Sequence, residues 1–204
     1  MKPWTLRSPF KFTVLILTLT LGLSQFAESR KRHRQSKVIE DLITEPLQEA
    51  LVSPPQDLEV CFSPEEPCDV KLIKFFRQAK TSLDIAIFDL TMDQAAHQIL
   101  EASKKIRVRI VADRRQAHEQ HSLIPLLIKA GVPLRYGHQR GIMHNKFTIV
   151  DGKMLETGSF NYTHHARKHN NENQIYIYNP VVVKKYTNRF EKLWSESDQP
   201  KLEN

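Results

Sequence analysis

The feature that most constrains the fold is the alternation of strand-like and helix-like segments from residue 58 onward. Short apolar runs of strand length alternate with segments whose apolar residues recur every three or four positions. Chains with this alternation bury a sheet between helices, because each apolar helix stripe needs a sheet face to cover it. The sequence therefore predicts an α/β fold, an α/β/α sandwich around a mixed β-sheet, over residues 58–198.

The expected elements follow from apolar spacing and from turn residues. Strands are expected at 58–62, 82–88, 106–112, 132–136, 146–150, 153–156 and 174–178. Helices are expected at 69–79, 91–100, 122–130 and 181–194. Asp69 and Thr91 are the expected N-caps of the first two helices. Asp151-Gly152 is typical of a tight hairpin turn between two strands.

The first 57 residues have a different character. Three basic residues precede an apolar run from Phe12 to Leu23, which is short for a membrane span and typical of a signal-peptide core. The basic run at 30–34 that follows weakens the orientation signal for export. We expect residues 1–29 to be a signal peptide or an uncleaved N-terminal membrane anchor, and residues 30–57 to be a linker. The expected location is periplasmic or secreted, with membrane association if the anchor remains.

The charge of the chain favours an anionic partner. The formal net charge is +7 and the pI is about 9.4. Without residues 1–29 the chain still has 27 basic and 22 acidic residues. Nucleic acid and anionic lipid are the partners that such a charge favours, and a basic protein with no polyanionic partner is the alternative.

The second half carries residues suited to phosphoryl chemistry. Lys146 begins the predicted strand at 146–150 and His144 lies two residues before it, so along an extended backbone the two side chains project from the same side. A neutral imidazole can attack phosphorus, and a lysine beside it can neutralise phosphate charge. Ser159 and Asn161 can donate hydrogen bonds to phosphoryl oxygens. A plain polar strand edge is the alternative for an isolated H-x-K pair.

Further positions extend this pattern. Gly158 allows a close approach of the backbone, and Asp151 at the strand end could orient a histidine or an arginine. The whole pattern reads His144-x-Lys146-x4-Asp151-x6-Gly158-Ser159-x-Asn161.

This pattern resembles the HKD motif of the phospholipase D superfamily. Asn171-Glu172-Asn173 is similar to the Glu-Asn element of the small bacterial endonucleases of that superfamily, and the stretch from Cys61 to Pro64 resembles their start. The resemblance covers roughly residues 58–196. It implies a phospholipase D-like fold and hydrolysis through a phosphohistidine, without a metal or another cofactor.

The resemblance also implies roles for single residues. His144, Lys146 and Asp151 are the expected catalytic residues. The expected substrate-binding residues are Gly158, Ser159, Asn161 and Glu172. The family needs a second histidine to protonate the leaving group, and no other histidine here is followed by lysine two residues on. Single-motif members meet this need as two-fold dimers, so we expect a homodimer.

The motif leaves the substrate open. An endonuclease acting on DNA or RNA is the favoured hypothesis because of the basic charge. A phospholipase D acting on phosphatidyl lipids or cardiolipin is the alternative, because the N-terminal apolar run and residues 30–34 could hold the chain at an anionic membrane. A non-catalytic nucleic-acid-binding module is the third hypothesis, and the intact motif argues against it.

Two further groups of residues remain to be placed. Cys61 and Cys68 are expected to form a disulfide in an oxidising compartment and to be buried thiols otherwise; zinc would need a second pair. His164, His165 and His169 are expected to form a solvated polar segment or a substrate contact, and metal binding is the alternative. Several basic residues lie near the motif in the sequence. They are expected either to be exposed loop charges or to form a substrate-binding rim: Arg114, Arg115, Arg135, His138 and Arg140.

Overall fold

The computed structural model describes residues 30–37, 58–137 and 141–200. The chain divides into two units, Met1–Pro55 and Gln56–Asn204. In the first unit, residues 30–37 form an exposed helix, so the start of the predicted linker is helical. The predicted signal peptide or anchor at residues 1–29 lies outside the described residues. Within the ranges that are described, no helix combines the length and the apolar character that a membrane crossing requires.

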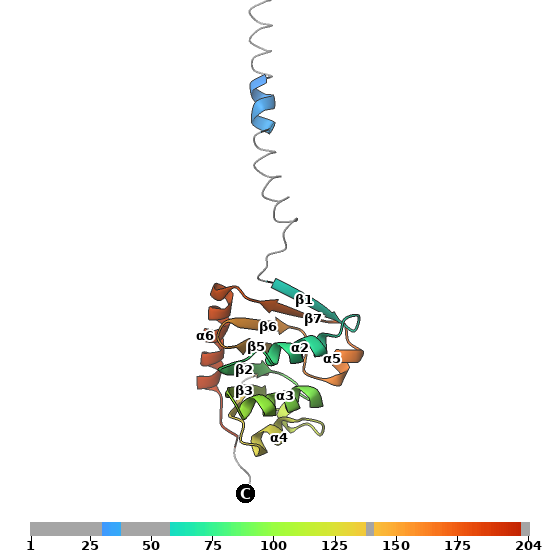
Figure 1. Cartoon of the computed structure of the whole chain (residues 1–204), viewed down its shortest axis with the longest axis vertical. Coiled ribbons are helices and arrows are strands. Elements are labelled where there is room, and N and C mark those ends of the chain that lie inside the picture. Colours follow the sequence, from blue (N-terminus) through green and yellow to red (C-terminus); the bar gives the residue numbers. More distant parts are fainter. Residues whose placement is uncertain (1–29, 38–57, 138–140, 201–204) are drawn as a thin grey trace, which may run out of the picture. The chain divides into compact units, whose positions relative to one another are not determined.

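A seven-stranded mixed sheet forms the centre of the second unit (Figure 1). Its order is β1-β7-β6-β5-β2-β3-β4. The strands β2, β3 and β4 are parallel, and the pairs β2–β5, β5–β6, β6–β7 and β7–β1 are antiparallel. The strand bounds are β1 Leu58–Ser63, β2 Ser82–Ile87, β3 Arg107–Asp113, β4 Leu134–Gly137, β5 Lys146–Val150, β6 Met154–Gly158 and β7 Glu172–Ile177.

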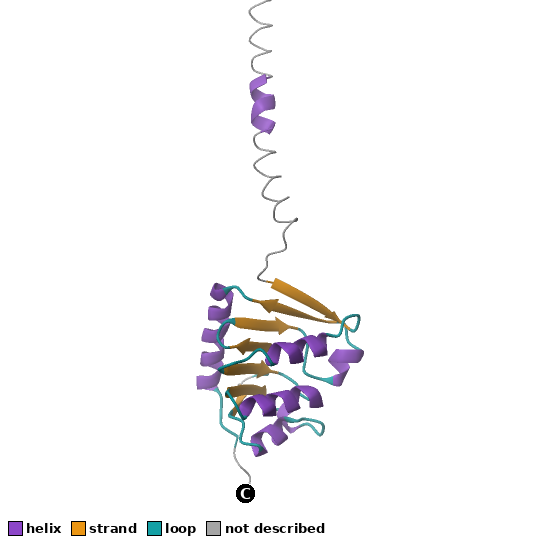
Figure 2. Cartoon of the chain, viewed as in Figure 1, coloured by secondary structure: helices purple, strands orange, loops and turns teal. Residues whose placement is uncertain are grey.

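Helices cover both faces of the sheet, as the predicted α/β/α sandwich requires (Figure 2). The long helix α6 lies on one face, and α2, α3 and α4 lie on the other (Figure 1). The helix bounds are α2 Cys68–Phe76, α3 Asp93–Ser103, α4 Ile124–Lys129, α5 His164–Lys168 and α6 Pro180–Glu196, with a short 3-10 helix η1 at Gln116–His118.

Two apolar clusters pack these layers together. The larger joins α2 and α3 to the sheet through side chains such as Leu72, Ile85 and Ile99, which are 0% exposed. The smaller joins α6 to the other face through Phe147, Ile149 and Phe190. The strand β5 contributes to both clusters, because its Val150 belongs to the larger one, and it is buried along its whole length. Burial on both faces explains the apolar character of its sequence.

The helix starts differ from the sequence prediction in two places. Pro67, not Asp69, is the N-cap of α2, because Asp69 turns inward and pairs with Arg167 at 2.8 Å. Met92, not Thr91, precedes α3. The expected hairpin turn is present, since Asp151 and Gly152 have φ of 55° and 64°, as a turn with two left-handed residues requires.

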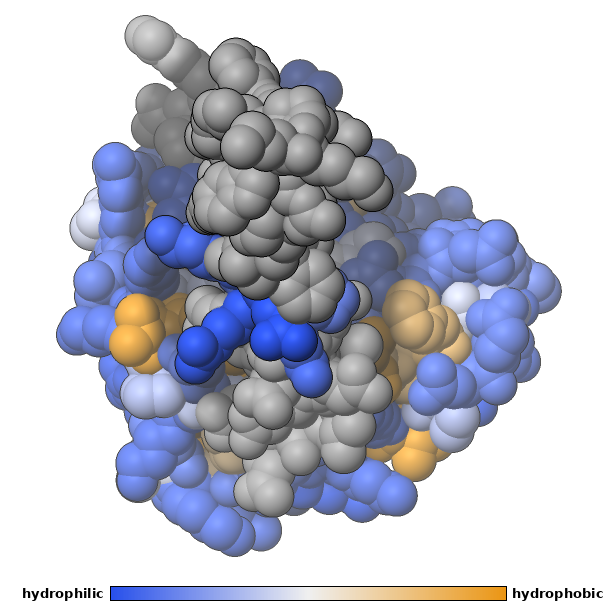
Figure 3. Space-filling model, turned by 90° about the horizontal axis from the view of Figure 1, so that it is seen from above, coloured by the Kyte–Doolittle hydropathy of each residue, from blue (hydrophilic) through white to orange (hydrophobic). Residues whose placement is uncertain are grey.

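The surface seen in Figure 3 is mainly hydrophilic, with apolar side chains in small separate groups. Among the described residues, the large apolar side chains with the highest exposed fractions are Val181, Phe62 and Ile142, at 65%, 54% and 51%. Phe62 and Ile142 belong to segments that approach the predicted site, and Val181 is the second residue of α6, at the other end of the sheet.

Candidate active site

The strand register brings the predicted site residues to one edge of the sheet. Ile87 at the end of β2 pairs with Lys146 at the start of β5, and Gly158 at the end of β6 pairs with Gln174 near the start of β7. The carboxyl ends of β1, β2, β3, β4 and β6 and the amino ends of β5 and β7 therefore meet there. We call this the His144 edge.

His144 and Lys146 lie together against Phe88, the residue after β2. The imidazole of His144 meets the Phe88 ring edge to face, with centroids 4.6 Å apart. Nζ of Lys146 lies 4.9 Å from the centroid of the same ring and donates a hydrogen bond to the carbonyl oxygen of His144 at 3.0 Å. His144 is exposed and Lys146 is buried. A solvent-exposed imidazole and a buried ammonium group thus contact the same aromatic ring.

The ammonium of Lys146 sits in a partly desolvated position. Burial lowers its pKa, while the negative charges of Glu172 and Asp89 act in the opposite direction. A cation that is already stripped of part of its water interacts strongly with an incoming anion, because the local dielectric constant is low. Lys146 is therefore suited to neutralise a phosphate at this edge.

Ser159 and Glu172 form a second part of the site. The hydroxyl of Ser159 donates a hydrogen bond to Oε2 of Glu172 and accepts one from the backbone N–H of Asn173 at 3.1 Å. The side-chain amide of Asn170 donates to Oε1 of Glu172 at 3.0 Å. These contacts hold Ser159, which follows β6, against the start of β7, and the negative charge of Glu172 acts on the ammonium of Lys146.

Gly158 is required by the neighbouring strand. A Cβ at this position would lie 2.1 Å from the backbone oxygen of Asn173. The close approach that the sequence predicted is thus between β6 and β7. The substrate-binding role of Gly158 remains a prediction.

Asn161 has an unused hydrogen-bonding atom. Its Oδ1 is buried and has no hydrogen-bond partner among the described residues. Buried polar atoms are usually paired, so an unpaired one calls for an explanation, and a ligand contact is one such explanation. Asn161 follows Ser159 by two residues. Its Oδ1 could accept from a protonated group of a ligand, and the NH2 of the same side chain is the part that could donate to a phosphate.

The comparison with known proteins agrees with this geometry. The family model described as "Cardiolipin synthase, PLD-like domain" matches residues 72–194, more than half of the chain. This chain belongs to the phospholipase D superfamily. The match begins in α2 and ends in α6, so it includes every residue of the HKD motif.

Several relatives cover the same region. The chain is 38% identical over 125 residues to a mitochondrial cardiolipin hydrolase of Chlamydomonas reinhardtii, a match that spans 61% of this chain and 56% of that protein. It is 36% identical over 129 residues to the mitochondrial cardiolipin hydrolase of Xenopus tropicalis, spanning 63% of this chain and 61% of that protein. The chain thus spans less than two thirds of the length of these curated relatives.

A solved structure supports the fold. Nuc from Salmonella typhimurium, a phospholipase D family member, matches with a TM-score of 0.66 and 29% sequence identity, covering 71% of this chain and 97% of that one. The phospholipase D-like fold predicted from the sequence is confirmed.

Asp151 lies away from the rest of the HKD motif. It follows β5 at the end opposite His144, where its carboxylate accepts hydrogen bonds from the backbone N–H groups of Lys80, Thr81 and Ser82 at 2.8–3.1 Å. Burial would raise the pKa of Asp151, but these hydrogen bonds outweigh it and lower the pKa. The structure therefore does not place Asp151 where it could orient His144. Its contacts fasten the connection between α2 and β2 to the β5–β6 hairpin.

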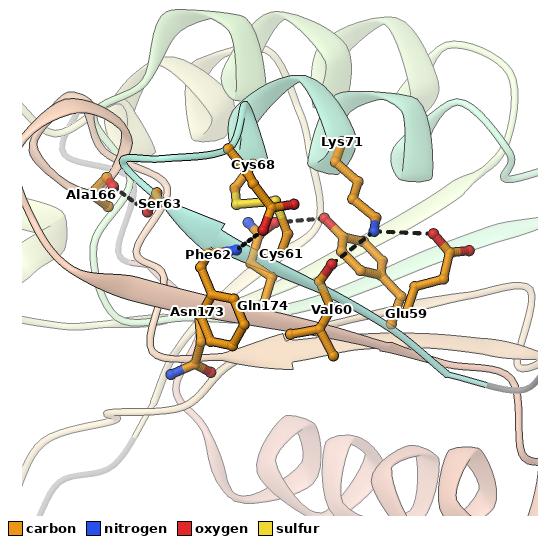
Figure 4. The surroundings of a disulfide bond; sticks show 12 residues. Glu59, Val60, Cys61, Phe62, Ser63, Cys68, Lys71, Ala166, Asn173 and Gln174 are labelled. Carbon is orange, nitrogen blue, oxygen red and sulfur yellow. Dashed lines mark hydrogen bonds and ion pairs between the residues drawn. A yellow bond between two sulfur atoms is a disulfide. The ribbon is translucent and has the colours of Figure 1, made fainter. Parts of the chain in front are cut away.

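A disulfide braces the start of the phospholipase D-like unit. Cys61 of β1 and Cys68 of α2 are bonded, with a Cα–Cα distance of 5.7 Å (Figure 4). The turn that they close holds α5, because the Ser63 hydroxyl donates to the carbonyl oxygen of Ala166 at 2.9 Å. The pair of Arg167 with Asp69 adds a second link. The α5 segment that follows Asn161 is thereby tied to β1 and α2.

The remaining predicted contacts lie around the site or outside the described residues. The rings of His165 and His169 are 5.4 Å apart, and His164 pairs with Asp93 at 3.4 Å. Over residues 30–37, 58–137 and 141–200, no three His, Cys, Asp or Glu side chains are grouped as a metal site would need. His138 and Arg140 lie outside the described residues. Arg114 pairs with Asp198, and the Arg135 guanidinium lies 4.5 Å from the Trp194 ring centroid.

Two residues of the His144 edge were missed by the sequence analysis. Phe88 is the platform for His144 and Lys146, and Asp113 accepts a hydrogen bond from the backbone N–H of Met143 at 2.8 Å. The sequence did contain a feature that could have indicated them. Both residues stand at the carboxyl ends of neighbouring parallel strands, where α/β proteins place their sites.

Proposed function

We propose that the chain is a metal-independent phosphodiesterase that hydrolyses nucleic acid through a phosphohistidine at His144. One observation carries the proposal: an exposed imidazole and a buried ammonium share the Phe88 ring at the His144 edge. Ser159 and Glu172 lie at the neighbouring strand ends of the same edge.

The chemistry assigns a step to each group. The imidazole of His144 attacks phosphorus and forms a P–N bond while the bond to the leaving oxygen breaks. A second histidine gives that oxygen a proton and then accepts a proton from the water that hydrolyses the phosphohistidine. Lys146 neutralises the charge of the phosphoryl oxygens, and the Asn161 amide donates to them in the transition state. The Ser159 hydroxyl has one proton, so it exchanges its hydrogen bond to Glu172 for one to a phosphoryl oxygen when substrate is bound.

The second histidine comes from a second copy of the chain in this proposal. Ile142 supports it: this side chain is 51% exposed and lies two residues before His144. An apolar side chain of that size beside a polar site is suited to an interface between copies. In a two-fold dimer the same surface meets itself, so two His144 side chains would face each other.

Nucleic acid is the substrate that the charge favours. Residues 58–200 carry 21 basic and 16 acidic residues. Arg115 and Lys168 are exposed, and they follow β3 and end α5 at the His144 edge. Backbone phosphates of a polynucleotide would interact with several such cations at once.

A phospholipid is the second candidate substrate. Relatives of 36–38% identity are named mitochondrial cardiolipin hydrolase, and the apolar run from Phe12 to Leu23 would hold the chain at a membrane. We further propose that the chain is exported, with or without a retained anchor. The Cys61–Cys68 disulfide supports an oxidising compartment.

A substrate panel in EDTA tests the proposed function. The protein is assayed with single-stranded DNA, RNA and cardiolipin vesicles, beside His144→Ala and the control His97→Ala on the exposed side of α3. We expect nucleic acid cleavage in EDTA, loss of at least about 10³-fold in His144→Ala and no change in the control. Release of phosphatidic acid without nucleic acid cleavage would favour the lipid reading, and activity that returns only with a divalent ion would contradict the mechanism.

A further inference from the structure

Asp113 is a buried carboxylate that contacts the segment carrying His144. It ends β3 and is 2% exposed. Its Oδ2 accepts a hydrogen bond from the backbone N–H of Met143 at 2.8 Å. Its Oδ1 accepts from the N–H groups of Arg115 and Gln116 at 3.0 and 3.1 Å. One carboxylate therefore joins the turn after β3 to the residue immediately before His144.

Met143 is fixed through its side chain as well. This side chain is 1% exposed and belongs to the apolar cluster on the α6 face. It packs directly on the backbone of Gly137, where an added Cβ would lie 2.4 and 2.7 Å from Cγ and Cβ of Met143. The peptide before His144 is thus held by Asp113 on one side and by the end of β4 on the other.

The two residues on either side of Met143 are exposed, whereas Met143 itself is buried. Ile142 and His144 are exposed, and β5 begins only at Lys146. His144 therefore lies between two buried anchors, Met143 and Lys146, and outside the regular strand. Its imidazole is placed by the backbone on both sides and by the contact with Phe88.

Placement matters because attack on phosphorus is sensitive to geometry. The reacting atoms must approach within about 3–3.5 Å in line with the leaving group, and a shift of about 1 Å can reduce the rate about 100-fold. Both oxygens of Asp113 are occupied by backbone N–H groups, so the carboxylate is not directed at a phosphate. Its effect on the reaction would pass through Met143.

We propose that Asp113 is a positioning residue, which fixes the His144 imidazole for attack through the backbone N–H of Met143. This inference rests on the proposed function of His144 as nucleophile. It assigns to Asp113 an effect on turnover that is separate from substrate binding.

The variant Asp113→Asn tests the proposal with little change of size. An amide has one accepting oxygen, so it cannot accept at both the β3 turn and Met143. We expect kcat to fall about 10- to 100-fold while KM stays within about 2-fold, because Lys146, Ser159 and Asn161 still bind the phosphate. In a uniformly labelled sample, the Met143 amide proton should exchange faster in the variant than in the wild type.

Two further variants separate positioning from general destabilisation. Asp84→Asn removes another buried carboxylate, which pairs with Arg109 in the middle of the sheet at 2.8 Å. It should lower Tm and leave kcat unchanged. Gly137→Ala displaces Met143 from the opposite side without a change of charge, and it should lower kcat as Asp113→Asn does.

The outcomes are distinguishable. Wild-type kcat in Asp113→Asn, in an enzyme whose His144→Ala variant is inactive, would overturn the positioning role and leave the proposed function standing. A fall in kcat no larger than that of Asp84→Asn at equal loss of Tm would do the same. Absence of turnover in the wild type with every substrate of the panel would overturn the proposed function and this role with it.

Discussion

At the scale of single residues, the structure contains a carboxyl group buried away from the His144 edge. Glu156 is 0% exposed, and burial raises its pKa to about 8 although the Tyr162 hydroxyl donates to Oε2 at 2.9 Å. Tyr162 also shares a hydrogen bond with the Thr148 hydroxyl at 2.6 Å. Oε1 has no hydrogen-bond partner among the described residues. Burial therefore favours the neutral form of Glu156 in the folded protein.

This raised pKa makes stability depend on pH. The unfolded chain releases the Glu156 proton near pH 4.5 and the folded chain only near pH 8, so the free energy of unfolding falls as pH rises between these values. Glu156→Gln mimics the neutral form and removes this dependence. We expect the two proteins to have similar Tm at pH 5 and the variant to be the more stable at pH 8, with a difference that grows by at most about 1.4 kcal/mol per pH unit. Thermal denaturation followed by circular dichroism measures the difference in Tm between wild type and variant. The same difference at pH 5 and at pH 8 would show that burial does not raise the pKa of Glu156.

Asp151 provides a second test at this scale. Its carboxylate accepts hydrogen bonds from three backbone N–H groups. These contacts lie at the end of β5 that is opposite His144. We expect Asp151→Ala to lower the free energy of unfolding by about 1–3 kcal/mol, because those donors lose their partner. Well below Tm, kcat should change much less than in His144→Ala. A loss of turnover equal to that of His144→Ala, in a protein with unchanged Tm, would support the catalytic role that the sequence predicts for Asp151.

At the scale of elements, the disulfide ties β1 to α2 and, through Ser63, to α5. The two cysteines are seven residues apart, so their bond removes about 2 kcal/mol of loop-closure entropy from the unfolded chain. Replacing both with Ser should lower the free energy of unfolding by about that amount in urea. Reductant should destabilise the wild type equally and leave the double variant unaffected. An unchanged wild-type transition, with both thiols shown to be free, would contradict this.

The elements show which parts of the fold a sequence can predict. The seven strands were predicted within a few residues because burial on one or both faces leaves an apolar pattern. The five-residue helix α5 is too short for such a pattern, and it depends on the Thr163 N-cap and on contacts with β1. Asp69 was misread as an N-cap because its pairing with Arg167 joins residues about a hundred positions apart. The HKD motif predicts His144 and Lys146 as site residues from the sequence alone, whereas Phe88 and Asp113 come near them only through the packing of β2 and β3 beside β5.

At the scale of the whole molecule, the proposed chemistry needs two histidines and the motif supplies one. We expect a homodimer in which two copies of His144 face each other. Mixing equal amounts of wild type and His144→Ala under free exchange leaves about a quarter of the dimers with both histidines, so activity per wild-type chain should fall by about half. Unchanged activity under demonstrated exchange would show that one chain suffices.

The same assembly predicts a role for Ile142. Because this exposed side chain adjoins His144, Ile142→Glu should weaken the dimer and reduce activity at low protein concentration. Val181→Glu alters a 65% exposed apolar side chain at the start of α6 and is the matched control. Equal sedimentation behaviour of the two variants would place the interface elsewhere.

The pairing of β1 with β7 also sets when the sheet can be completed during synthesis of the chain. Leu58 in β1 pairs with Ile177 in β7. The first strand of the sheet therefore has no pairing partner until the ribosome has released the last strand. Lys146 and Glu172 are translated late as well, and α6 follows them to cover one face. A nascent chain released early would lack the covering helix and the strand that holds Ser159. Truncated products should therefore carry His144 without the surroundings that would make it a nucleophile.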